Sequence, residues 1–487
     1  MVHINCLAMR RTLSFFIATI LISISIASCE RDNFSTDPSL KLEFSTDTML
    51  FDTVFTTIGS ATRRFKVYNR NSNNLTITSV KLAKGNQSFF RLNVDGQATT
   101  DARDISLRSG DSLFIFVEVN VDPTNQNSPL FISDSIVFET NRNVQDVKLI
   151  AWGQDVVLFN ADSLLTNTVF SADKPYLIYK YLWVYPGVEL KINAGAKLYF
   201  HSNAWLYVDG KLTINGQPEN PVVFEGDRLE AFYKDKPGQW GGIWLTTNSV
   251  NNFINWAVIK NAIAGINIFP YANQSNRTLV INNSIIKNMS YMAIDARGAW
   301  IDAGNCLFAN SKEMCLSLAG GIYRFNHCTI ANYWGQYVNR TGPALLLANY
   351  FVYKQNSDEI QLVEYGMDET YFRNSIIYGS REKEIELVSS YYEQQINAPF
   401  NFLFENTILR VDASTNLTDE NRFKNILTEN PKFIKPFESN FQLDTLSPAK
   451  DFGLINSALL FPFDLNNVSR TSDTGPDLGA FERVELR

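Results

Sequence analysis

Cysteine and histidine are scarce in this sequence, with five cysteines and three histidines among 487 residues. Cys6 and Cys29 belong to the first thirty residues, so Cys306, Cys315 and Cys328 are the cysteines left for the folded body. Their number is odd, and their spacing lacks the CxxC pattern of zinc sites. The sequence therefore predicts no disulfide framework, no metal and no cofactor.

The chain also lacks a concentration of positive charge. Its 43 Lys and Arg residues are outnumbered by 50 Asp and Glu residues, which gives a net charge of -7, and no long basic block is present. We therefore expect no nucleic-acid partner. The chain is too long for one ordinary hydrophobic core, so two or three domains or one elongated repeat are expected.

The first 28 residues have the pattern of an export signal. Arg10 and Arg11 precede an apolar run over 13–27 that is too short to span a bilayer as a helix. The run ends in "IASC", residues 26–29, which resembles the lipobox of bacterial lipoproteins. The resemblance implies that residues 1–28 are removed and that Cys29 is the lipid-attachment residue, which anchors the protein in the outer membrane of a Gram-negative bacterium.

The residues after Cys29 bear on the side of the membrane that the protein faces. Residues 30–32, "ERD", resemble the acidic export tags that place some lipoproteins on the outer face of the membrane. The alternative is a charged, solvated tether. We expect a tether over 29–39 and a location on the cell surface, and the sequence leaves the leaflet open.

Residues 40–155 alternate between apolar and polar positions in short runs such as "RRFKVYN" and "SLFIFVEVNV", separated by turn clusters such as "NRNSNN". About seven strands of this kind, each with one apolar face, are typical of an antiparallel sandwich. The sequence predicts an immunoglobulin-like β-sandwich. Residues 47–80 resemble the opening of a family of lipoprotein β-sandwiches related to those of ciliary and cell-surface proteins, which implies a spacing or binding module.

Several Asp-Ser and Asp-Thr dipeptides precede an apolar residue, as in the O-glycosylation acceptor of some producers of surface lipoproteins. Such dipeptides also occur at strand starts, where Asp and Ser end turns, and both interpretations stay open. The dipeptides begin at Asp47, Asp52, Asp111, Asp134, Asp162 and Asp444.

An eight-residue phrase recurs in the second part of the chain. "INNSIIKN" at 281 nearly copies "INWAVIKN" at 254, and looser versions begin at 303, 325, 372 and 404. The fourth position is small and the sixth is large and apolar. Because both point the same way along a strand, each phrase is expected to bury one small and one large side chain. The eighth residue is often Asn, which tolerates the left-handed backbone of a turn.

The step of about 22 residues between the phrases at 281, 303 and 325 is one coil of a right-handed parallel β-helix, in which like residues stack about 4.8 Å apart. Repeated helical hairpins are the alternative, but the phrases are too short and too β-branched for them. Residues 204–226 resemble the first coils of β-helix lipoproteins, with a Gly-x-Leu-x-x-x-Gly pattern followed by Asn-Pro. The sequence thus predicts an all-β chain whose β-helix covers 156–440.

The tail, residues 441–487, resembles the closing segment of many β-helix surface proteins. We expect it to cap the open end of the solenoid, since such ends need cover. The residues that carry the resemblance are Ser447, Pro448, Asp464, Arg470, Asp477, Gly479 and Glu482.

No catalytic residue is predicted. The glycosidases of this fold use clustered aspartates that include an adjacent pair, and the sequence contains no Asp-Asp dipeptide. Asp295, Arg297 and Asp302 lie close in sequence, but we expect them at a coil corner. His327 occupies the third position of a phrase, where Asn is usual, so it is interpreted as a turn residue.

Cys306 and Cys328 share the small inward position one coil apart. Their Cα atoms would be within disulfide range, but parallel Cβ vectors give poor geometry for a bond. We therefore expect buried free thiols.

If alternate residues of the early strands point inward, Trp205, Tyr207 and Trp244 point outward. Exposed aromatic side chains on a flat sheet can stack on sugar rings or on a partner protein. The alternative is that the sandwich or a loop covers these three side chains. These three residues are the predicted ligand contacts.

The leading hypothesis is a lipid-anchored, non-catalytic protein that binds or scaffolds an extended glycan or a membrane protein complex. One alternative is a polysaccharide lyase or glycoside hydrolase that acts on the β-helix face, but only analogy of fold supports it. Another is an accessory subunit of an outer-membrane β-barrel machine.

Overall fold

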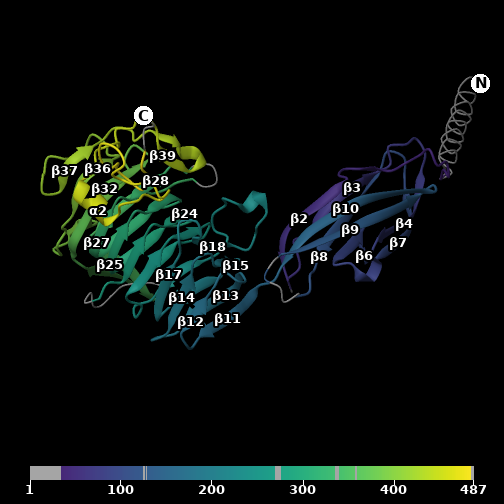
Figure 1. The fold of residues 1–487 in the computed structure, drawn as a ribbon, viewed down its shortest axis with the longest axis horizontal. Helices are drawn as coiled ribbons and strands as arrows, with labels where there is room; N and C mark the ends of the chain where they lie inside the picture. Colours follow the sequence, from purple (N-terminus) through teal and green to yellow (C-terminus); the bar gives the residue numbers. More distant parts are fainter. Residues whose placement is uncertain are drawn as a thin grey trace, which may run out of the picture. The chain divides into compact units, whose positions relative to one another are not determined.

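The computed structural model describes residues 34–483 apart from 57, 124–126, 128, 269–275, 335–338 and 357–358. The chain divides between Asp155 and Val156 into two compact units (Figure 1). Cys29 lies outside the described residues. None of the helices in the described part of the chain has the length and hydrophobicity of a membrane span.

The N-terminal unit is a β-sandwich of two five-stranded sheets, with the strand orders β1-β3-β8-β5-β6 and β2-β10-β9-β4-β7. The neighbouring strands pair antiparallel, except β2 and β10, which pair parallel. Both sheets alternate buried and exposed residues, as the sequence predicted. The elements are β1 (Glu43–Phe44), β2 (Thr48–Phe55), β3 (Arg63–Tyr68), β4 (Leu75–Leu82), the short 3-10 turn η1 (Gly85–Gln87), β5 (Phe90–Val94), β6 (Gln97–Thr99), β7 (Asp101–Leu107), β8 (Ser112–Val119), β9 (Leu130–Thr140) and β10 (Asn143–Gln154).

The sandwich begins earlier than the predicted tether allows. Phe34 forms a β-bridge with Asn74, and the backbone N–H of Ser35 donates to the carbonyl of Asn74 at 2.9 Å. The second half of 29–39 is therefore part of the folded unit. Only residues 30–33 separate Cys29 from the first of these contacts.

The second unit is a parallel β-helix of 23 paired strands, which confirms the predicted all-β fold class. Most strands pair with the strand three places earlier and the strand three places later, so a coil contributes three faces (Figure 1). The right-handed sense of the coil stays a prediction. The strands are β11 (Val157–Leu164), β12 (Thr168–Phe170), β13 (Tyr176–Val184), β14 (Glu189–Asn193), β15 (Lys197–Phe200), β16 (Trp205–Val208), β17 (Lys211–Asn215), β18 (Val222–Gly226), β19 (Gly242–Leu245), β20 (Asn252–Asn255), β21 (Ala257–Lys260), β22 (Ile266–Ile268), β23 (Leu279–Asn282), β24 (Ile285–Met289), β25 (Ile294–Gly304), β26 (Leu307–Ser311), β27 (Leu316–Asn326), β28 (Thr329–Asn332), β29 (Leu345–Ala348), β32 (Met367–Gly379), β33 (Ile385–Val388), β36 (Leu403–Leu409) and β37 (Phe423–Leu427).

We name the three faces by their strands. Face A contains the end of β13, then β16, β19, β22, the starts of β25 and β27, β29 and β33. Face B contains β14, β17, β20, β23, the ends of β25 and β27, and the start of β32. Face C contains the start of β13, then β15, β18, β21, β24, β26, β28 and the end of β32.

The recurring phrases stack in the predicted register. The pairings run Ile259 to Ile286, Phe308, Ile330, Ile377 and Leu409, and each of these sixth-position side chains is fully buried. The small fourth-position residues are buried beside them, and they are Ala257, Ser284, Cys306, Cys328, Ser375 and Thr407. Cys306 and Cys328 are buried free thiols, as predicted, and so is Cys315.

Each phrase turns a corner between faces B and C at its third residue, whose φ is positive. The sequence predicted a left-handed residue at the eighth position. Asn261, Asn288 and Asn310 have a positive φ there, whereas Asn332 does not. The third-position residues, whose φ values run from 47° to 55°, are Trp256, Asn283, Asn305, His327, Asn374 and Asn406.

The corner asparagines form a ladder of hydrogen bonds between coils. Asn283 donates from Nδ2 to Oδ1 of Asn255 at 2.7 Å, and Asn305 donates to Oδ1 of Asn283 at 2.8 Å. His327 takes one place in the ladder, where Asn374 donates to its Nε2 at 2.8 Å. Burial lowers the pKa of His327, so the imidazole is neutral and serves the turn.

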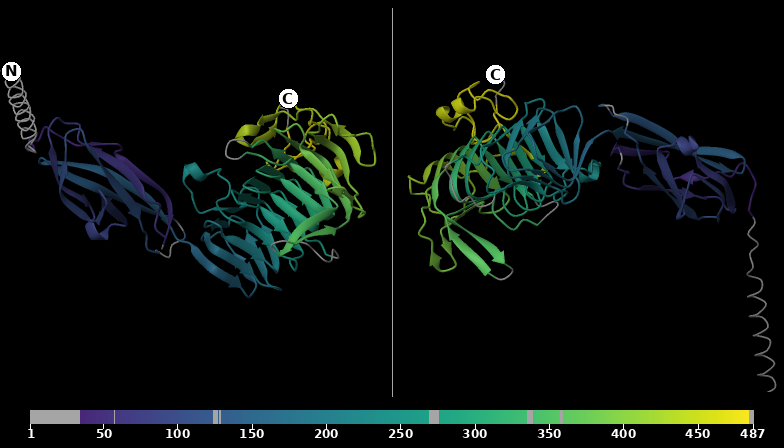
Figure 2. Two further views of the ribbon diagram at one scale, coloured as in Figure 1. Left: turned by 180° about the vertical axis from the view of Figure 1, so that it is seen from behind. Right: turned by 90° about the horizontal axis from the view of Figure 1, so that it is seen from below.

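The C-terminal segment, which begins at β38 (Phe433–Lys435) and not at the predicted residue 441, packs on the outside of face C; Figure 2 shows it in yellow beside the coils. The prediction of an end cap is corrected here: the contacts of this segment run along the side of the coils. The reason is that the strands of face C carry apolar side chains on their outer side as well as their inner side in these coils. The outer side chains must therefore be buried by another segment, as in any sheet that is apolar on both sides. The outward residues that are covered include Leu307, Ala331, Ile376 and Ile408, and the residues that cover them include Phe433, Phe441, Leu443 and Leu478.

A buried ion pair fastens this segment. The guanidinium of Arg470 donates to the Glu482 carboxylate at 3.0 Å, to Oδ1 of Asn305 at 2.8 Å and to the carbonyl of Gly479 at 3.0 Å. Both charged side chains are fully buried. The bond to Asn305 ties the segment to the asparagine ladder, which accounts for the Arg and Glu of the tail motif.

Shorter elements complete the unit. One hairpin follows β29 and another follows β33, and the C-terminal segment contains a third hairpin and a short helix. These elements are β30 (Tyr350–Asn356) with β31 (Glu359–Glu364), β34 (Ser390–Tyr391) with β35 (Gln394–Gln395), β38 (Phe433–Lys435) with β39 (Asn440–Leu443), α2 (Ile455–Leu460), and the 3-10 turns η2 (Ala231–Tyr233) and η3 (Pro436–Glu438).

Candidate ligand-binding face

The predicted aromatic residues are neighbours on the outside of face A. Tyr207 lies opposite Trp244 in the register of β16 with β19, and their rings are 5.9 Å apart between centroids. Trp205 contacts both, at 6.1 Å from Tyr207 and 5.8 Å from Trp244. Leu206 and Val208 point into the core and are fully buried, so alternation along the strand turns the aromatic rings outward.

The coil below extends this surface. In β13, Tyr181 lies opposite Trp205 and Trp183 lies opposite Tyr207. Tyr185 follows the strand and contacts the Trp183 ring at 5.0 Å. Tyr181 and Tyr185 keep 36% and 42% of their surface exposed. We name the set of Tyr181, Trp183, Tyr185, Trp205, Tyr207 and Trp244 the aromatic face.

Sequence reasoning missed the first three of these residues. The stretch "YLIYKYLWVY", residues 176–185, is aromatic or apolar at nearly every position. It therefore has no alternation of polar and apolar residues that would show which side chains point inward and which point outward. The backbone also bends at Lys180, whose φ is 62°, which separates inward Tyr176 from the residues after the bend. The positive φ in the middle of an apolar run is not visible in the sequence.

Two glycines hold Trp205 in place. A Cβ on Gly241 would lie 2.2 Å from Cε2 of Trp205, and one on Gly242 would lie 3.2 Å from Cζ3 of the same ring. The indole therefore lies against the backbone of the next coil, where only glycine leaves room for it. This contact accounts for Gly241 in "GQWGGIWL", whereas Gly242 is required by its φ of 144° and by the carbonyl of Ala264, which would lie 2.0 Å from a Cβ.

Polar groups border the aromatic face. At the end toward face B, Asp209 accepts hydrogen bonds from the hydroxyl of Thr246 and from Nδ2 of Asn248. Nε1 of Trp183 and Oδ1 of Asn267 are shielded from solvent and have no hydrogen-bond partner among the described residues. Buried polar atoms are usually bonded, so these two are exceptions beneath the surface of the aromatic face.

The acidic residues noted in the sequence do not converge. Asp295 follows Trp244 and Asn267 along face A and is paired with Arg297 at 3.0 Å. Asp302 lies on face B, where it is paired with Arg277 at 2.7 Å. The expectation of a coil corner is corrected, because the corner of this coil is at Gly298, with φ 64°, and the aspartates lie on different faces.

Nothing in the described part of the chain resembles a metal centre. No group of three or more His, Cys, Asp and Glu side chains that could hold an ion is present among the described residues. The aromatic face itself carries no carboxylate.

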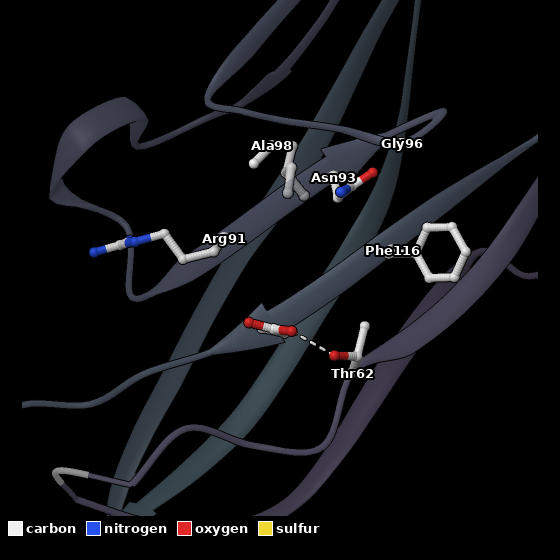
Figure 3. Close-up of a pocket in the computed structure, with 8 residues that line it drawn as sticks. Thr62, Arg91, Asn93, Gly96, Ala98 and Phe116 are labelled. Carbon is white, nitrogen blue, oxygen red and sulfur yellow. Dashed lines mark hydrogen bonds between the residues drawn. The ribbon is translucent and has the colours of Figure 1, made fainter.

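A second candidate site lies on the sandwich and was not predicted. It is a depression of about 370 Å³ on β5 and β8, lined among others by Arg91, Asn93, Phe116 and Glu118 (Figure 3). Arg91 is held by the carbonyls of Ser88 and Phe90. Oδ1 of Asn93 is shielded and has no hydrogen-bond partner among the described residues.

No family model and no curated protein matches this chain. Similar solved structures include a protein of unknown function from Porphyromonas gingivalis W83, at 15% identity over 26% of this chain and 60% of that chain, with a TM-score of 0.19. An ASH/PapD-like domain of human CEP192 shares 10% identity over 26% of this chain and 96% of its own, with a TM-score of 0.17.

The catalytic unit of a GH87 alpha-1,3-glucanase from Streptomyces thermodiastaticus is similar over 74% of this chain and 87% of its own, at 9% identity and a TM-score of 0.18. Similarities of this size assign neither a family nor an activity to the chain.

Proposed function

We propose that this protein is a non-catalytic, lipid-anchored binding protein whose aromatic face holds an extended glycan. The observation that carries the proposal is the contiguous set of six aromatic side chains on the outside of face A, three of them on the coils of β16 and β19. Tyr181 and Tyr185 are exposed, and the other four rings are half-buried. Contiguous apolar surface of this kind marks interaction sites.

The chemistry of the aromatic face suits sugar rings. A pyranose has an apolar face that stacks on an aromatic ring, and its hydroxyls need polar partners at the edge. Asp209 supplies such a partner beside the rings. Since the rings are fixed on strands of a rigid sheet, little conformational entropy is lost when a ligand is bound.

The membrane anchor is part of the proposal. If Cys29 is acylated, the four residues 30–33 and Phe34 hold the sandwich within roughly 18 Å of the bilayer, at 3.3–3.6 Å per extended residue. The sandwich is then the unit that directly follows the anchor in the chain. Outer-membrane and surface location are proposed on the signal and the residues after it.

The anchor is tested with Cys29→Ala in the full-length chain. We expect the wild type to incorporate an alkyne-labelled fatty acid and to fractionate with the outer membrane, and the variant to do neither. Surface exposure is then measured by digestion of intact cells with a protease. A variant that stays membrane-bound and labelled would show that another residue carries the lipid.

The binding function is tested by purification of the intact lipoprotein from membranes, followed by sugar and protein analysis of what accompanies it. We expect a glycan with the wild type and with the control Tyr392→Ala, whose ring is 87% exposed elsewhere. The triple variant of Trp205, Tyr207 and Trp244 to Ala should lose it. Equal recovery with all three proteins would contradict the role of the aromatic face.

The other two hypotheses make different predictions for the same purification. A β-barrel protein that accompanies all three proteins would favour the accessory-subunit hypothesis. A lyase or hydrolase would shorten an added polysaccharide. That alternative has little support among the described residues, because Asp295 is ion-paired with Arg297 and the nearest other acid of β25, Asp302, lies on another face.

A further inference from the structure

Three side chains stack on the corner where faces C and A meet. Ile178, Phe200 and Gly226 are paired in register on successive coils, so the residues that follow them lie one above another. These residues are Tyr179, His201 and Asp227.

The imidazole of His201 is held from two sides. Its Nδ1 lies 2.7 Å from Oδ2 of Asp227, whose side chain is 11% exposed. The Tyr179 ring stacks on the imidazole with 4.1 Å between centroids and 3° between planes. The His201 side chain itself is 45% exposed, so the ring is fixed at the surface of the molecule.

This arrangement leaves one nitrogen for a ligand. With Asp227 ionised, Nδ1 carries the proton that is donated to the carboxylate, and in this tautomer Nε2 is the acceptor. Among the described residues nothing bonds to Nε2. A hydroxyl is the ligand group that such an acceptor takes.

The column borders the aromatic face. Tyr179 and Tyr181 belong to the same strand, β13, and a tight turn in which the N–H of Ala204 donates to the carbonyl of His201 at 2.9 Å leads directly to Trp205. The acceptor therefore lies at the end of the aromatic face toward face C, opposite the end that Asp209 borders.

The charges at this surface disfavour an acidic ligand. In the residues that form it, 179–185, 201–209, 227 and 242–246, the side chains charged at neutral pH are Lys180, Asp209 and Asp227. A surface that binds a polyanion needs several Lys or Arg side chains to complement its negative charge, whereas on this surface the acidic side chains outnumber the basic ones.

We propose that the His201 column is the polar end of the aromatic face and that the ligand is a neutral glycan, one hydroxyl of which donates to Nε2 of His201. The inference rests on the proposed function and adds the class of ligand and a residue that selects it.

The test is affinity electrophoresis of the lipid-free mature protein at pH 7.5 in gels that contain dextran, mixed-linkage β-glucan, mannan or polygalacturonate. We expect at least one neutral polysaccharide to retard the protein and polygalacturonate not to. His201→Phe keeps the ring stacked on Tyr179 but removes both nitrogens, and it should weaken binding about 3- to 10-fold, which is the worth of one hydrogen bond. His201→Gln restores an acceptor and should recover part of the loss.

Retardation by polygalacturonate that equals or exceeds that by the neutral polymers would overturn the inference. So would unchanged binding by His201→Phe when the triple variant of Trp205, Tyr207 and Trp244 to Ala has lost it, a result that leaves the proposed function standing. If no polymer retards the wild type, the proposed glycan function and the inference both fail. Thermal melting of each variant checks that it is folded.

Discussion

The indole of Trp205 lies against the backbone of Gly241 on the next coil, so closely that a Cβ at that glycine would be 2.2 Å from Cε2 of the ring. This contact fixes the ring at the centre of the aromatic face, since Trp205 touches both Tyr207 and Trp244. The orientation of a proposed binding residue thus depends on a glycine that no ligand would touch.

Gly241→Ala is therefore expected to displace Trp205 and to weaken glycan retardation in affinity gels by more than tenfold. Overpacking of this kind costs about 1–3 kcal/mol of stability, so the protein should remain folded. The control is Gly475→Ala, where the nearest atom to the new Cβ is 3.5 Å away and no change is expected. Full binding by Gly241→Ala would show that the position of Trp205 is unimportant.

Arg470→Met is expected to loosen the C-terminal segment. It removes the buried pair with Glu482 and the bond to Asn305, and loss of one partner of a buried pair costs about 3–5 kcal/mol. Limited proteolysis should then cut within 441–483 at lower protease concentration. Lys435→Met, which breaks an exposed pair with Glu438, should cost under about 1 kcal/mol. Equal protease resistance of the two variants would contradict this account.

The same segment should respond to pH through Asp477. Burial raises the pKa of this carboxyl to about 6 from 3.8, and the neighbouring Asp451 and Asp473 add to the shift. Between these two values the folded state holds a proton that the unfolded state has released. The free energy of unfolding should therefore fall as pH rises from about 4 to about 6, by at most about 3 kcal/mol.

Asp477→Asn has no carboxyl to titrate at this position. Urea unfolding of the wild type and this variant at pH 4 and pH 7 measures the difference between them. A smaller loss of stability in the variant is expected between the two pH values, and an identical loss in both proteins would rule out the contribution of Asp477.

The three cysteines of the β-helix should be unreactive in the folded protein. All three are fully buried, and burial raises the pKa of Cys315 to about 12, so the thiolate is nearly absent at pH 8. In the mature chain with Cys29→Ser, we expect no reaction with a thiol-reactive dye until denaturant is added, and then three equivalents. Rapid labelling of the native protein would contradict the burial of these three cysteines in the core of the β-helix.

Much of the β-helix could be predicted because its signal is repeated. Each phrase places a small and a large residue two positions apart, so the column from Ile259 to Leu409 and the inward Cys306 and Cys328 follow from register alone. The outward direction of Trp205, Tyr207 and Trp244 follows from the same alternation.

The rest depends on contacts between distant parts of the chain. The side-on docking of the tail is decided by Arg470 and Asn305, which are 165 residues apart, and by the second apolar side of face C. Nothing local to residues 441–487 indicates which surface they cover. The His201 column was missed because its members belong to three coils without a repeated phrase, so their register could not be aligned.

The most direct test of the account is hydroxyl-radical footprinting of the mature protein with and without the neutral polysaccharide that retards it most in affinity gels. We predict that the polysaccharide protects Trp205, Tyr207 and Trp244 from oxidation, whereas the exposed rings of Phe232 and Tyr392 are oxidised equally in both samples. Unchanged oxidation of the three residues in the presence of bound polysaccharide would contradict the central claim that the aromatic face holds the ligand.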